Sequence, residues 1–119
     1  MARPDVSLSA LRTDLRRFAA ARDWQQFHTP KNLAMALSVE AAELLEHFQW
    51  LTPEQSSRLD AKARREVGEE LADVLLYLTR LADVLGIDPL TAARRKLRLN
   101  ARKYPVSKAK GNARKYSEL

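Results

Sequence analysis

Two acidic segments carry the side chains most able to do chemistry. They contain Glu40, Glu43 and Glu46 in the first segment and Glu69, Glu70 and Asp73 in the second. Residues three apart lie one turn apart on the same face of an α-helix. Two such carboxylate pairs on facing helices predict a cation site. Ligands that are all oxygens favour a hard ion, Mg²⁺ or alternatively Mn²⁺.

The position of Glu40 on its helix distinguishes this predicted cation site from acidic pairs that simply lie on a solvent-exposed helix face. On a helical wheel Glu40 falls within the apolar sector that contains Leu33, Leu37 and Leu44, and Glu43 falls near the edge of that sector. Glu40 is therefore expected to point inward. An ionised carboxylate in a core is costly unless it is neutralised, paired or bound to a cation.

The sequence predicts four long helices, and two of them carry these acidic residues. Capping and proline signals start them at Ser7 or Ser9, at Thr29-Pro30, at Ser57 or Asp60, and at Asp88-Pro89. Their predicted ends lie near Arg22, Trp50, Gly86 and Lys103, and Thr52-Pro53 predicts a short extra turn. No stretch alternates with strand periodicity, so the predicted fold is an all-α four-helix bundle. The apolar segment Val74–Leu78 predicts a central third helix.

Composition narrows the class of protein. The 119 residues suit one domain, and the absence of cysteine excludes disulfides and thiolate metal sites. No apolar run approaches the roughly 20 residues of a membrane span. We therefore expect a cytoplasmic protein with no membrane partner.

Charge divides the chain unevenly. Residues 1–93 hold 11 Lys/Arg against 14 Asp/Glu, whereas residues 94–119 hold 10 against 1. A basic segment attracts an anion, which could be a nucleic acid, a membrane surface or a small phosphorylated ligand. We predict a domain over residues 1–105 and an extended basic tail over residues 106–119, which is mobile or ordered by a partner chain or a ligand.

The connection before the second helix holds Trp24 and Phe27 beside His28. These aromatic rings could form a ligand wall or could cap the core, and both interpretations stay open. His28 and His47 are each expected to be exposed or hydrogen-bonded at a helix edge.

Several motifs together resemble one known family. They are Arg22-Asp-Trp24-x-Gln-Phe27-His28-x-Pro30-Lys31-Asn32, Glu40-x-x-Glu43-x-x-Glu46-x-Phe48-Gln49-Trp50, Glu69-Glu70-Leu-x-Asp73-Val-Leu-x-Tyr77-Leu78, Asn100-x-x-x-Tyr104-Pro105 and Lys115-Tyr116. This order resembles the MazG-like nucleotide pyrophosphohydrolases, within them the dCTP pyrophosphatase branch. The resemblance covers roughly residues 8 to 118.

The resemblance implies an all-α bundle of the NTP pyrophosphohydrolase type that assembles as a homodimer or homotetramer. It implies Mg²⁺ held by Glu40, Glu43, Glu70 and Asp73. Glu46, one turn beyond, would orient or deprotonate water. The implied reaction converts a nucleoside triphosphate and water to a monophosphate and pyrophosphate.

The resemblance also implies which residues hold the substrate. Trp24 and Trp50 match base-pocket positions. The phosphate and sugar side corresponds to Lys96, Asn100, Lys103 and Tyr104, and substrate-binding roles also fall to His28, Lys31 and Asn32. One departure is Leu15, which stands where a histidine helps enclose the base in the animal enzymes.

The resulting hypothesis is a Mg²⁺-dependent, pool-cleansing pyrophosphohydrolase acting on dCTP or related or modified (deoxy)nucleotides. The alternative is a non-enzymatic helical module that binds nucleic acid through its basic C-terminal part. The alternative leaves the inward-pointing Glu40 without a purpose, so nucleic acid is not the expected partner.

Overall fold

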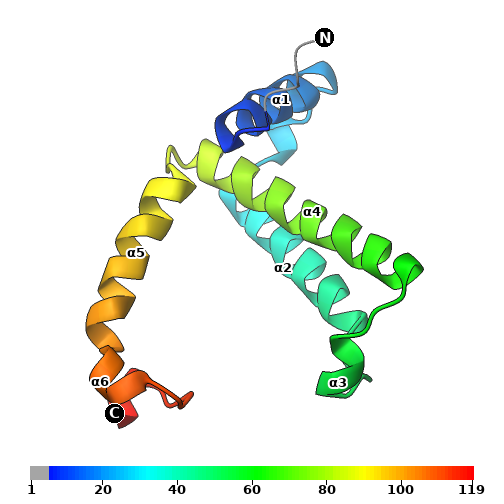
Figure 1. Cartoon of the computed structure of the whole chain (residues 1–119). Helices are drawn as coiled ribbons and strands as arrows, with labels where there is room; N and C mark the ends of the chain where they lie inside the picture. The colour runs from blue at the N-terminus through cyan, green and yellow to red at the C-terminus, as the bar shows by residue number, and fades with distance from the viewer. Residues whose placement is uncertain (1–5) are drawn as a thin grey trace. The chain divides into compact units, whose positions relative to one another are not determined.

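The computed structural model describes residues 6–119, which contain helices and no strand (Figure 1). The elements are α1 (Leu8–Ala21), the 3₁₀ turn η1 (Gln25–Phe27), α2 (Pro30–Glu46), α3 (Pro53–Ser56), α4 (Ala61–Val84), α5 (Pro89–Lys103), α6 (Val106–Ala109) and the 3₁₀ turn η2 (Tyr116–Glu118). The all-α prediction is confirmed, and the four predicted long helices correspond to α1, α2, α4 and α5. The chain divides into two compact units, Met1–Gly86 and Ile87–Leu119.

Side-chain caps start the helices where the sequence predicts them. Five residues cap a helix by accepting a hydrogen bond, through a side-chain hydroxyl or carboxylate oxygen, from a backbone N–H of the first turn. They are Ser7, Thr29, Thr52, Asp60 and Asp88. These bonds satisfy donors that a helix start otherwise leaves unpaired. Of the two starts left open for the first and third helices, the structure selects Ser7 and Asp60. Gly86 follows α4 at a φ of 69°, a left-handed conformation that glycine adopts readily.

The second helix ends at Glu46, earlier than the predicted end near Trp50. Beyond Glu46, the His47 N–H bonds to Leu44 O at 3.3 Å and the Phe48 N–H bonds to Leu45 O at 2.9 Å. These bonds close over three residues and tighten the chain into a turn. The turn leads to Thr52, which has a ψ of 162° and must be extended to cap α3.

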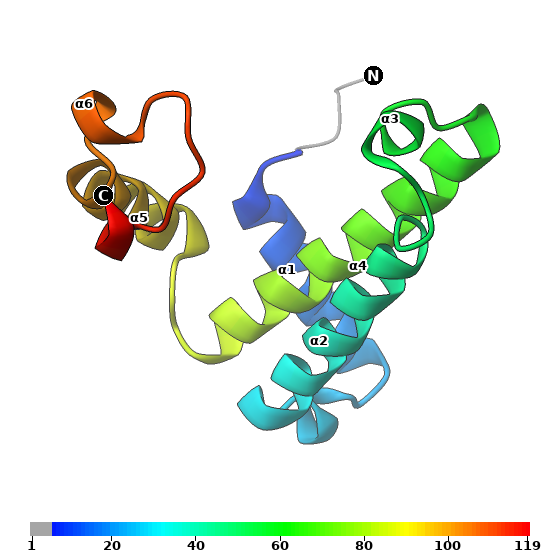
Figure 2. The same cartoon turned by 90° about the horizontal axis from the view of Figure 1, so that it is seen from below.

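In the first unit, α2 and α4 run side by side in opposite directions, and α1 packs against α4 (Figures 1 and 2). The most buried apolar side chains come from all three helices: Ala19, Leu33, Val67 and Ala82. Both α1 and α2 contact α4, so the predicted central place of the third helix is confirmed. The facing sides of α2 and α4 carry the acidic residues.

Part of the apolar surface of this unit is exposed. Leu71, Leu75 and Leu78 on α4 are 52%, 43% and 42% exposed, and Met35 and Val39 on α2 are 51% and 56% exposed. The spacings of three and four residues place the α4 leucines along one stripe of the helix. The sequence predicts an apolar α4, and the structure shows which side of it the first unit leaves exposed.

The second unit contains α5, α6 and η2. The Tyr104 and Tyr116 rings meet edge to face at 6.1 Å, and Lys103 Nζ lies 4.7 Å from the centre of the Tyr116 ring. Residues 106–119 therefore contain local structure that their polar sequence did not predict. Within the described range 6–119, no helix combines the length and apolar character that crossing a membrane requires.

Candidate metal and nucleotide site

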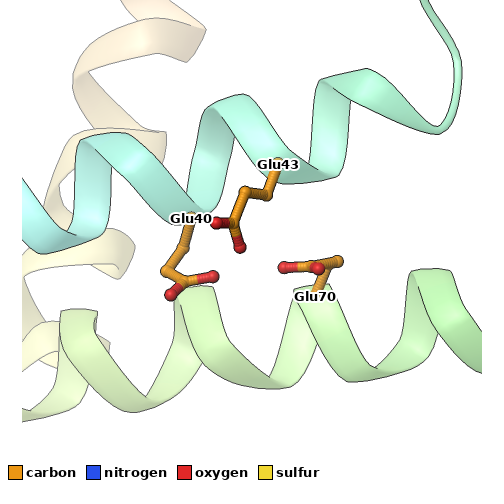
Figure 3. Close-up of side chains that lie close together, drawn as sticks. All are labelled: Glu40, Glu43 and Glu70. Atoms are coloured by element: carbon orange, nitrogen blue, oxygen red, sulfur yellow. The ribbon is translucent and has the colours of Figure 1, made fainter.

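Three glutamates from two helices meet between α2 and α4. Glu40 and Glu43 project from α2 toward Glu70 on α4 (Figure 3). One carboxylate oxygen from each of the three lies within 4.8 Å of the others. The i, i+3 spacing aligns the two α2 side chains, and the adjacent α4 supplies the third. The sequence predicts this convergence.

The cluster is electrostatically unbalanced without a cation. Glu40 Oε2 and Glu70 Oε2 are buried, and no described residue donates a hydrogen bond to either atom. The pKa of Glu40 is raised to about 7, first by its hydrogen bond with Glu43, then by burial and by the charges of Glu43 and Asp73. Buried, unpaired carboxylate oxygens that repel one another fit a divalent cation, which would satisfy the oxygens and offset the repulsion.

The other predicted acids lie around this triad. Asp73, one turn after Glu70 on α4, stands outside the group of three, and its charge acts on Glu40. Glu46 is exposed at the end of α2, and Glu69 is exposed beside Glu70. Three of the four predicted ligands therefore converge, and the fourth lies near them. The ligand set itself stays a prediction.

A pocket of about 140 Å³, called the Trp24 pocket below, adjoins the acidic site because Asp73 is one of its lining residues. Its lining is apolar and aromatic with few polar groups: Leu15, Phe18, Trp24, His28, Asp73, Leu76, Tyr77 and Arg80. The Trp24 ring meets Phe18 edge to face at 5.6 Å and His28 at 6.3 Å. Trp24 thus contributes to a pocket wall, whereas Phe27 is 59% exposed and does not line this pocket.

Other predicted substrate residues of the first unit lie outside this pocket. Trp50 is 86% exposed, and Lys31 is exposed in the first turn of α2. Asn32 Nδ2 donates to the Phe27 carbonyl at 3.0 Å and fastens the connection before α2. The substrate-binding roles of these three residues remain predictions.

The predicted phosphate-side residues belong to the second unit. Lys96 and Asn100 lie on α5, and Lys103 and Tyr104 lie where α5 ends. Lys96 and Lys103 are exposed, whereas Asn100 and Tyr104 are half-buried. Their roles also remain predictions.

The sequence interpretation missed a polar network in the pocket wall. Arg80 Nε donates to His28 Nδ1 at 3.0 Å, and Arg80 Nη1 contacts Asp83 Oδ2 at 3.4 Å. Burial lowers the pKa of His28, and the Arg80 charge lowers it further. The i, i+3 spacing of Arg80 and Asp83 on one helix was the available signal.

Comparison with known proteins identifies the family. The model of the MazG-like family matches residues 35–119, a range that includes the whole glutamate triad. The chain belongs to the MazG-like family. Among relatives of this MazG-like chain, dCTP pyrophosphatase 1 of Homo sapiens is 42% identical over 118 residues, which cover 98% of this chain and 69% of the human protein.

A second relative and a solved structure are also similar to this chain. dCTP pyrophosphatase 1 of Mus musculus is 41% identical over 118 residues, covering 98% of this chain and 69% of the mouse protein. The crystal structure of a pyrophosphatase from Archaeoglobus fulgidus superposes with a TM-score of 0.79 at 43% identity, covering 88% of this chain and 98% of that one. The predicted family and the predicted enzyme class, a nucleotide pyrophosphohydrolase, are confirmed for this MazG-like protein.

Proposed function

We propose that this MazG-like enzyme hydrolyses dCTP, or a related or modified (deoxy)nucleoside triphosphate, to the monophosphate and pyrophosphate in a Mg²⁺-dependent reaction. The observation that carries the proposal is the triad of Glu40, Glu43 and Glu70, with two buried oxygens that no described residue satisfies. An aromatic pocket beside it supports a nucleotide ligand, because bases stack on aromatic rings. Relatives named dCTP pyrophosphatase 1 support the cytosine nucleotide.

The roles of the acidic residues follow from charge and position. Glu40, Glu43, Glu70 and Asp73 would hold the cation. A bound Mg²⁺ neutralises phosphate charge and makes a coordinated water more acidic. Glu46, one turn after Glu43, is proposed to orient or deprotonate the attacking water.

The remaining substrate contacts are assigned by chemistry. Trp24 is proposed to stack on the base. Lys96, Asn100, Lys103 and Tyr104 are proposed to bind phosphate and sugar through their donor groups, which would steady the charge that develops during hydrolysis.

A panel of canonical and 5-modified nucleoside triphosphates tests the proposal, with pyrophosphate release as the readout. We expect turnover that requires Mg²⁺ and is highest with a cytosine nucleotide. A gel-shift titration at physiological salt tests the alternative function. Tight, salt-sensitive DNA or RNA binding without hydrolysis of any triphosphate would contradict the enzyme and favour the nucleic-acid module.

The pocket wall gives a separate prediction. Trp24→Ala should raise KM for the preferred nucleotide by roughly tenfold or more, because stacking on one aromatic ring is worth about 1 to 3 kcal/mol per base. Steady-state kinetics measure the change, and circular dichroism at rising temperature reports folding. An unchanged KM in a folded variant would remove Trp24 from the base site.

Trp50→Ala is the companion variant, because the sequence predicts the same role for a side chain that is 86% exposed in the chain. A comparable rise in KM would support a base contact for Trp50. A wild-type KM in Trp50→Ala would show that Trp50 does not contact the base, and Trp24 would remain the proposed stacking residue.

We further propose that the enzyme assembles as a homodimer or homotetramer through the exposed apolar stripe of α4. Leu75→Lys should reduce the assembly to smaller species while helix content is retained, because a lysine in an apolar interface must be desolvated. Light scattering coupled to size-exclusion chromatography measures the mass. Glu69→Lys, at an exposed position two residues before Leu71 and therefore on the other side of α4 from the leucine stripe, is the control. A Leu75→Lys protein with wild-type mass would contradict the interface.

A further inference from the structure

A buried guanidinium forms part of the wall of the Trp24 pocket. Arg80, on α4, is only 9% exposed and is one of the residues that line this pocket. A buried charge is costly unless it is paired and hydrogen-bonded. His28 and Asp83 are such partners, so the Arg80 side chain is held in place before any ligand binds.

Two contacts fix the guanidinium. Its Nε donates to His28 Nδ1 at 3.0 Å, and its Nη1 donates to Asp83 Oδ2 at 3.4 Å. Asp83 is itself held by Arg16, whose Nε and Nη2 donate to the two carboxylate oxygens at 2.7 and 2.5 Å. The orientation of Arg80 thus depends on a chain of bonds that links α1, the connection before α2, and α4.

The same contacts fix the protonation of His28. An arginine only donates, so His28 Nδ1 must accept, and the neutral ring carries its proton on Nε2. Burial and the Arg80 charge lower the pKa of His28, which favours this neutral form. His28 and Arg80 therefore both present N–H donors on the wall that they share.

The unused donors of Arg80 suit a particular ligand edge. His28 and Asp83 take one N–H from Nε and one from Nη1, and no other described side chain engages the remaining three N–H groups. A guanidinium offers paired, coplanar N–H groups that match two adjacent acceptors. The O2/N3 edge of cytosine and the O6/N7 edge of guanine have such a pair. Thymine and uracil place an N3–H between their carbonyls, and adenine has no carbonyl oxygen and places its amino group beside N1 and N7.

We propose that Arg80 is a specificity-determining residue that selects a base presenting a carbonyl oxygen next to an unprotonated ring nitrogen. His28 and Asp83 are positioning residues, because they act on the base through Arg80. This inference rests on the proposed function, since it assumes that the base enters the Trp24 pocket.

Kinetics on the full chain test the proposal with dCTP, dGTP, dTTP and dATP. We expect Arg80→Gln to lower kcat/KM for the preferred base by roughly tenfold or more, the discrimination typical of a bidentate base contact. The less favoured bases should change little, so the ranking flattens. Whether dCTP or dGTP loses more identifies which acceptor pair is read. Arg64→Gln removes an exposed guanidinium from the same helix and should keep wild-type selectivity.

A purely structural role for Arg80 predicts a different pattern. It would lower kcat/KM for all four nucleotides by the same factor, and this result would overturn the proposal. A folded Arg80→Gln protein with the wild-type ranking would overturn it as well. If melting shows that Arg80→Gln does not fold, Arg80→Lys decides, because it keeps the charge and lacks the planar pair of donors. Loss of selectivity in Arg80→Lys supports the proposal, and wild-type selectivity overturns it.

Binding of the monophosphates separates this inference from the proposed function. Metal-free titration of dCMP, dGMP, dTMP and dAMP, followed by tryptophan fluorescence, reports base selection without turnover. If the wild type hydrolyses no triphosphate, the proposed function fails. The affinities for the four monophosphates still show whether Arg80 selects the base. Selective binding that Arg80→Gln abolishes supports the inference, whereas affinities that do not depend on the base overturn it.

Discussion

Glu70→Gln is expected to reduce pyrophosphate release by roughly a hundredfold or more, the scale at which a single electrostatic group at a reacting centre contributes. Glu70 contributes one of the three converging oxygens, and its Oε2 is buried without a hydrogen-bond donor among the described residues. Glutamine keeps the shape and removes the charge. Mg²⁺ should therefore raise the melting temperature of the variant much less than that of the wild type.

The neighbouring residue supplies a matched control for this experiment. Glu69 is exposed beside half-buried Glu70 on the same helix, so Glu69→Gln makes the same chemical change outside the cluster. It should keep most of the activity and the full stabilisation by Mg²⁺. Metal-free Glu70→Gln should also melt higher than metal-free wild type, because fewer like charges repel. Equal activity in the two variants would contradict the role of the triad.

In the metal-free protein, the contribution of the Glu40 carboxyl to thermal stability should fall as pH rises from about 5 to 8. The folded-state pKa of Glu40 is raised to about 7 from an ordinary value of 4.5, so the folded state binds the proton more tightly than the unfolded state does. This contribution is fully present below about pH 4.5 and is lost as pH rises through 7. Melting in a chelator at several pH values measures it.

Glu40→Gln isolates the effect of this carboxyl. His28 acts in the opposite direction in the same window, because its lowered pKa makes the folded state bind a proton less tightly. The difference in melting temperature between wild type and Glu40→Gln should therefore change by several degrees across the window. A cation displaces the proton, so stabilisation by Mg²⁺ should be larger at pH 8 than at pH 5.5. A difference that is flat with pH would contradict the raised pKa.

Local features of this molecule could be predicted because they depend on residues close in sequence. The caps at Thr29 and Asp60 need only a side chain and the N–H three residues later. The convergence of Glu40 and Glu43 on Glu70 needs one helix period and two adjacent helices. Sequence spacing supplies the caps and the helix period directly, whereas the adjacency of α2 and α4 follows from packing a few helices into one bundle.

The polar wall of the pocket could not be predicted in the same way. Arg80 meets a histidine 52 residues away, and Asp83 meets an arginine 67 residues away. These pairs exist because α1 and the connection before α2 come close to the C-terminal half of α4. Helical periodicity alone does not fix that approach. The exposed Trp50 shows the converse, because a residue that matches a family motif need not line a pocket within one chain.

Analysis of the products formed from dCTP, with Mg²⁺ and with chelator, tests both the reaction and the role of the acidic cluster. We expect dCMP and pyrophosphate in equal amounts with Mg²⁺, none with chelator, and almost none from Glu70→Gln under either condition. Formation of dCDP and inorganic phosphate would contradict the reaction. Product formation that is unchanged in chelator would contradict the role assigned to the acidic cluster.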